Sequence, residues 1–187
     1  MEQQMLGQPQ TVKIFGIMHV ILAGYGILMS AFALIVAFAG NPILKLMPKN
    51  PAMAAQAQMQ AEMQEKMMPA TVISTVITVI IAVLMLIAGI KLLKKRKDGL
   101  KWSNRYAWTS LAGKAVNLVL AFTFTLPLMS EMTKSMSHGR AAMPAAFDTI
   151  VVASTIFGVL IMCVYPILSL ILLNRPRTKE WFAAQPV

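Results

Sequence analysis

The chain has 187 residues, of which 57% are apolar and only 13% are charged, and its formal net charge is +10. A soluble domain of this size cannot bury so much apolar surface in one core, so the composition excludes an ordinary soluble protein. The basic residues gather at the ends of apolar runs, where membrane proteins place them for topology. We therefore do not expect the charge to serve nucleic-acid binding.

Four apolar runs dominate the chain, at about Ile14–Ala39, Thr71–Ile90, Tyr106–Met129 and Thr149–Leu173. A helix needs about 20 apolar residues to cross a hydrocarbon core about 30 Å thick. The first, second and fourth runs contain no charged residue, and the third is interrupted by Lys114. The sequence predicts one all-α domain over residues 1–187, an integral membrane four-helix antiparallel bundle.

The basic residues are divided unequally between the two sides of the predicted bundle. Eleven would lie on one side, namely Lys13, Arg175, Arg177, Lys179 and the seven of the Lys91–Arg105 loop, and five on the other. The positive-inside rule then places both termini and this loop in the cytoplasm. We expect a bacterial inner membrane, because the compact chain shows no eukaryotic targeting signal. Six loop residues are predicted to contact anionic headgroups: Lys94, Lys95, Arg96, Lys97, Lys101 and Arg105.

The segment Pro51–Met68 between the first two runs is rich in Ala, Gln and Met, which favour helix. Met59, Met63 and Met67 share one face at a spacing of four residues. We expect a short amphipathic helix lying on the external surface. Methionine sulfurs are soft ligands that suit Cu(I), so external Cu(I) handling is one alternative function. The other interpretation is that these side chains only fill the apolar side of a surface helix. The second external segment, Ser130–Phe147, is expected to be irregular.

Small residues recur every three or four positions along the first run, which is typical of helices that pack closely in membranes. The predicted packing positions are Gly16, Ala23, Gly26, Ser30, Ala33 and Ala37. Ser154 and Gly158 form a similar pair in the fourth run. We expect these faces to carry helix association, either within the chain or with another chain.

Four polar residues are predicted to meet in the cytoplasmic half of the bundle: His19, Lys114, Asn117 and Tyr165. Ionisable residues inside membranes are costly and usually face the protein interior, so they are candidates for function. A lysine beside a histidine could bind an anion or take part in proton transfer. Alternatively, Lys114 extends its amine to the headgroups, and His19 and Asn117 serve as interhelical hydrogen-bond partners.

The sequence contains no metalloprotease, phosphate-loop, nucleophile-elbow or CxxC motif, so we expect no enzyme activity and no cofactor. The leading interpretation is a non-enzymatic integral membrane protein that acts through helix packing. It would be an accessory or assembly subunit of a membrane complex, or a homo-oligomer. The first alternative is a transporter or channel for a small solute or ion, in which the polar cluster lines the path. External Cu(I) handling is the second.

Overall fold

The computed structural model describes residues 8–39, 51–137 and 146–185, and these residues form helices and turns without any strand. Four helical segments are long and apolar enough to cross a membrane: Gln10–Phe38, Ala61–Leu93, Gly99–Glu131 and Thr149–Leu173. Each contains most or all of one predicted apolar run. The described part is therefore all-helical, and its four long apolar helices are compatible with an integral membrane protein.

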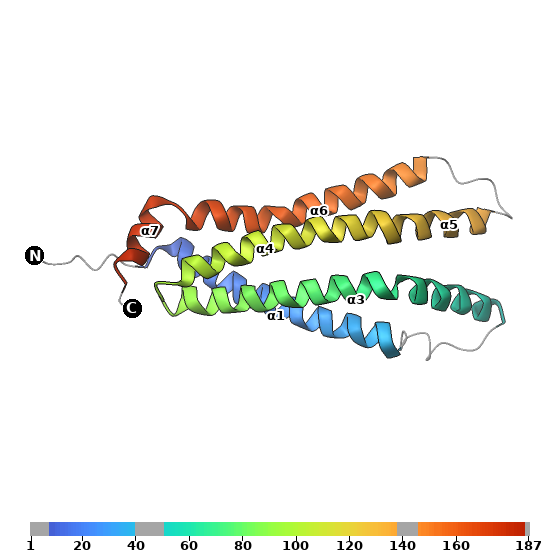
Figure 1. Cartoon of the computed structure of the whole chain (residues 1–187), viewed down its shortest axis with the longest axis horizontal. Coiled ribbons are helices and arrows are strands. Elements are labelled where there is room, and N and C mark those ends of the chain that lie inside the picture. Colours follow the sequence, from blue (N-terminus) through green and yellow to red (C-terminus); the bar gives the residue numbers. More distant parts are fainter. Residues whose placement is uncertain (1–7, 40–50, 138–145, 186–187) are drawn as a thin grey trace, which may run out of the picture.

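The four long apolar segments extend roughly along a common axis (Figure 1). The described helices are α1 (Gln10–Ala39), α3 (Pro51–Leu93), α4 (Gly99–Leu120), the π-helical turn η1 (Ala121–Thr125), α5 (Leu126–Ser137), α6 (Ala146–Leu173) and α7 (Pro176–Ala183). Helix α1 packs mainly on α3, α3 also packs on α4, and α4 packs on α6. The contact between α1 and α6 is much smaller.

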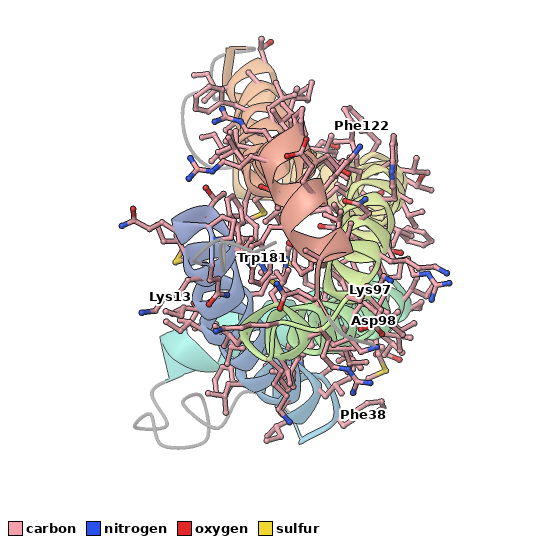
Figure 2. All side chains as sticks on the ribbon, turned by 90° about the vertical axis from the view of Figure 1, so that its left-hand side faces the viewer. Lys13, Phe38, Lys97, Asp98, Phe122 and Trp181 are labelled. Carbon is pink, nitrogen blue, oxygen red and sulfur yellow. The ribbon has the colours of Figure 1, made fainter. Side chains whose placement is uncertain are left out.

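One end of the bundle, which we name the turn end, holds the α3–α4 turn, the start of α1 and α7 (Figure 1). Its core is built from large buried side chains of four helices: Val12, Phe15, Leu92, Leu173, Trp181 and Phe182. Figure 2, viewed from this end, shows Trp181 among the helices, whereas Lys13 points outward. Helix α7 therefore closes the turn end of the bundle. We name the opposite end the far end.

Three features differ from the sequence predictions. Residues of Pro51–Met68 are helical, but they continue directly into the second span as one 43-residue helix and do not form a separate surface helix. The expected irregular segment begins as helix, since α5 runs to Ser137, while residues 138–145 lie outside the described part. Helix α7 was not predicted: Asn174-Arg175-Pro176 indicates the end of a helix, and α6 does end at Leu173, but the proline also occupies the first turn of a new helix.

The small residues of α1 lie against α3. Ala23, Ser30 and Ala37 are buried, and a Cβ added at Gly26 would lie 3.5 Å from the Cβ of Ala82. The two helices come close at Gly16, where an added Cβ would lie 2.8 Å from Cδ2 of Leu93, and at Gly89 of α3, where it would lie 2.8 Å from the Cβ of His19. The α1 stripe is thus used within the chain.

The α3–α4 turn is closed by a Schellman motif, in which the N–H of Lys95 bonds to the Leu92 carbonyl and that of Arg96 to the Lys91 carbonyl. Lys95 takes the left-handed conformation that this motif needs, with φ of 54°. At the far end, the Gln64 amide donates to the carbonyls of Val36 and Ala37. The extension of α3 therefore satisfies carbonyls in the last turn of α1 that have no partner within that helix.

Candidate functional site

A buried polar cluster in the described part of the bundle is centred on His19 of α1, which is fully buried. Its Nδ1 lies 2.7 Å from the hydroxyl of Tyr165 on α6 and 2.7 Å from the carbonyl oxygen of Phe15. Its Nε2 lies 3.4 Å from the hydroxyl of Ser103 on α4, which in turn lies 3.1 Å from Ser169 on α6. The cluster therefore joins three helices near the turn end.

The partners of His19 determine where its proton lies. A carbonyl oxygen can only accept, so the contact with Phe15 places the proton on Nδ1, and the Tyr165 hydroxyl beside the same nitrogen can then only accept. Neutral His19 then has a lone pair on Nε2, to which Ser103 donates, and Ser169 completes the chain by donating to Ser103. Interhelical hydrogen bonds of this kind contribute about 0.6–2 kcal/mol each in membranes.

Lys114 is connected to this cluster only indirectly. Its Nζ donates to the hydroxyl of Ser110, one turn earlier in α4, at 2.8 Å. The Tyr106 ring, one turn before Ser110 in α4, packs edge-on against His19 with centroids 4.9 Å apart. The structure thus brings His19 and Tyr165 into direct contact, whereas Lys114 makes its hydrogen bond to Ser110 and not to His19.

Asn117, the fourth predicted member, lies elsewhere. It lines a cavity of about 460 Å³ between α1, α3 and the α4–η1 segment, on the far side of the His19 cluster. The cavity walls include Ser30, Thr75 and Thr78. The predicted cluster is therefore divided into a hydrogen-bonded group at the turn end and one residue in a separate cavity.

The cationic loop is partly paired with its own acid and aromatic side chains. Lys91 donates to the carboxylate of Asp98, and its Nζ lies 4.6 Å from the ring centroid of Trp102. The hydrogen bond from Lys91, together with the charges of Lys91 and Arg96, lowers the pKa of Asp98 below its ordinary value of 3.8. The guanidinium of Arg105 also lies over the Trp102 ring, 5.3 Å from its centroid.

Four cations border a groove of about 710 Å³ between α4, the end of α6 and α7. These cations are Lys97, Lys101, Arg105 and Lys179, and we name the groove that they border the basic groove. Its floor contains a reciprocal amide pair, since Asn104 donates to Asn174 at 3.2 Å and Asn174 donates back at 2.8 Å. The sequence reasoning placed three of these cations at headgroups but missed Lys179 and the amide pair, because α7 was not foreseen.

The remaining predicted positions are scattered. Ser154 of α6 is exposed and donates only to Val151 of its own helix, and a Cβ added at Gly158 would meet no atom within 4 Å. Met63 and Met67 are half-buried, and the side chain of Met59 lies outside the described part. The Cu(I) alternative stays a prediction.

Comparison of the chain with protein-family models, with curated proteins and with solved structures gives no match in any of the three. Function must therefore be argued from the geometry of this chain.

Proposed function

We propose that the protein is a non-enzymatic integral membrane protein that acts by helix association, and that a second copy of the chain docks on the far half of α6. The observation that carries this proposal is the open face at Gly158. Helix α3 packs against the corresponding small residues of α1, whereas no side chain of the described part packs on Gly158.

The α6 face has the composition of a membrane helix interface. Ile150, Ser154, Phe157, Gly158 and Ile161 recur at helical spacing, so they share one side of the helix. Ile150 and Phe157 are 63% and 64% exposed. Small residues allow two backbones to approach closely, and larger neighbours then interlock around the contact. A two-fold dimer needs one self-complementary face, which a single stripe of this kind supplies.

The proposal includes an orientation. We place the turn end in the cytoplasm of a bacterial inner membrane, with both termini on that side and successive spans running antiparallel. The unequal division of basic residues supports this assignment, as does the basic groove at the turn end, which suits the phosphates of anionic lipids.

The test is association of the full chain in proteoliposomes, measured by energy transfer between labelled copies over a range of protein-to-lipid ratios. Gly158→Leu should weaken association by about tenfold or more, which corresponds to about 1.4 kcal/mol. Ile156→Phe also adds bulk at an exposed position, but Ile156 lies about 160° around α6 from Gly158 and should leave association unchanged. A wild-type chain that stays monomeric at every ratio, or two variants that behave alike, would contradict the proposal.

A further inference from the structure

The basic groove lies where two of the long apolar segments end. The segment that contains α4 begins at Gly99, and the segment that contains α6 ends at Leu173. Lys97 of the groove precedes the first of these limits, and Lys179 on α7 follows the second. In a chain that spans the membrane, the groove therefore opens at the level of the lipid headgroups.

The four cations of the groove have no counter-charge within the protein. All four are exposed, and none of them forms an ion pair with an acid of the described part. The acid nearest to them in sequence, Asp98, pairs with Lys91 and Arg96 instead. No Asp or Glu borders the groove. Like charges around one groove repel each other, so an anion bound between them lowers the energy.

The floor of the groove is neutral, and its hydrogen bonds are made within the protein. Asn104 and Asn174 bond to each other, and Asn174 also donates to the carbonyl of Leu170 at 2.7 Å. The groove therefore offers cationic donors at its border and no carboxylate anywhere in its lining. An ammonium group placed there would find no acid to pair with. This arrangement favours an anionic headgroup without an amine.

The lining changes from charged to aromatic along α4. Lys97, Lys101 and Arg105 recur every four residues, so they form one stripe. Trp108 also borders the groove, is 66% exposed, and lies about 10 Å further along the helix axis than Lys101. A phospholipid has the same order, with a charged phosphate at the surface and acyl chains below it. A free phosphate ion has no part that would contact Trp108.

We propose that the basic groove binds one phospholipid whose headgroup is anionic and carries no ammonium group. Its phosphate lies between Lys101 of α4 and Lys179 of α7, and an acyl chain lies against Trp108. The volume of about 710 Å³ is in the range of about 300–1,000 Å³ found for small-molecule sites. The lipid thereby connects α4 to α7. This inference rests on the membrane-spanning part of the proposed function, but not on the association of two copies.

The test is quenching of tryptophan fluorescence in the full chain by phospholipids with brominated acyl chains. Proteoliposomes of dioleoylphosphatidylcholine receive a small fraction of brominated phosphatidylglycerol or, as the matched probe with the same chains, brominated phosphatidylethanolamine. Bromine quenches only at short range, so a lipid that binds beside Trp108 quenches more than random mixing predicts. We expect phosphatidylglycerol to be preferred by about fivefold or more, the effect of one cation near an anionic headgroup. Trp108→Phe should remove most of the excess quenching.

Two double variants with the same change of net charge separate a defined site from general attraction. Lys101→Gln with Lys179→Gln removes one cation from α4 and one from α7, both at the groove. Lys94→Gln with Arg177→Gln removes one exposed cation from the α3–α4 turn and one from α7, neither of which borders the groove. We expect the first variant to lose the preference for phosphatidylglycerol and the second to retain it. Circular dichroism shows that both are folded.

Glycerol phosphate added to the buffer distinguishes a lipid from a soluble phosphate ester. It should not restore the fluorescence, because it has no acyl chain; displacement of the lipid by it would overturn the assignment. Equal quenching by the two lipids, equal behaviour of the two double variants, or full excess quenching in Trp108→Phe would each overturn the proposal as well. These readouts need only one copy of the chain and leave Gly158 unchanged, so failure here and failure of the proposed dimer are distinguishable.

Discussion

Replacing Gly89 with alanine tests whether the close contact between α1 and α3 holds the bundle together. The added Cβ would lie 2.8 Å from the Cβ of His19, 2.9 Å from a methyl group of Val20 and 3.0 Å from the carbonyl oxygen of Gly16. Two of these atoms belong to the backbone or are bonded directly to it. No side-chain rotation can therefore relieve the clash, and the helices must separate.

The size of the effect follows from these distances. Carbon atoms pack at about 3.5–4.0 Å, and a radial gap of about 0.5–1 Å already loses a quarter to a half of each dispersion contact that the separation affects. Overpacking of this kind costs about 1–3 kcal/mol. Helix propensity acts in the other direction, because alanine in a helix interior is favoured over glycine by about 0.5–1 kcal/mol.

Gly24→Ala is the matched control, because Gly24 also lies within a long helix but an added Cβ there meets no atom within 4 Å. The gain in helix propensity is common to both variants, so their difference isolates the steric cost. We expect Gly89→Ala to be less stable than Gly24→Ala by about 1–3 kcal/mol. The measurement is equilibrium unfolding by sodium dodecyl sulfate in mixed micelles, followed by tryptophan fluorescence. Equal stability of the two variants would refute the close packing of α1 on α3.

Two further predictions concern the turn end. The pKa of Asp98 is lowered in the folded chain by its bond to Lys91, so the ion pair contributes stability above the unfolded pKa of 3.8, and this stability is lost as the pH falls through the folded value. The temperature of thermal unfolding in detergent should thus fall less in Asp98→Asn than in wild type between pH 5 and pH 3, roughly the window of this titration. Identical pH profiles of the two proteins would exclude a contribution from this pair. At the basic groove, Lys101→Gln combined with Lys179→Gln should reduce the number of anionic lipids retained in native mass spectrometry. Lys13→Gln, at an exposed residue elsewhere at the same end, should not. Equal retention by both would indicate non-specific attraction.

The long helices were predictable because membrane hydropathy is a strong signal over 20 or more residues. The small-residue stripe of α1 was also predictable, since spacing alone puts Ala23 and Ser30 on one face. Spacing does not say which neighbour covers that face. The structure assigns the α1 stripe to α3 and leaves Gly158 open, a distinction that depends on helix rotation and tilt.

The polar cluster could be predicted only in part. A histidine and a tyrosine at similar depth on two helices indicate a contact, and His19 and Tyr165 make one. Ser103 gave no usable signal, because a serine in the first turns of a span resembles an interfacial residue. Asn117 is three residues from Lys114, and the prediction therefore placed it with the same group. The π-helical turn that follows at Ala121 has no sequence signature of its own.

The two halves of the bundle are built differently, and this difference limits where a second chain can bind. At the turn end the buried residues are large, and α7 adds Trp181 and Phe182 to a core that already joins α1, α3 and α6. In the far half the buried residues are small, such as Ser30, Ala70 and Thr75. Small side chains make few dispersion contacts, so the far half gains less packing energy and retains space. The open face at Gly158 and the cavity at Asn117 both lie there. A second chain that binds in the far half can therefore do so without disturbing the core that fixes the helices.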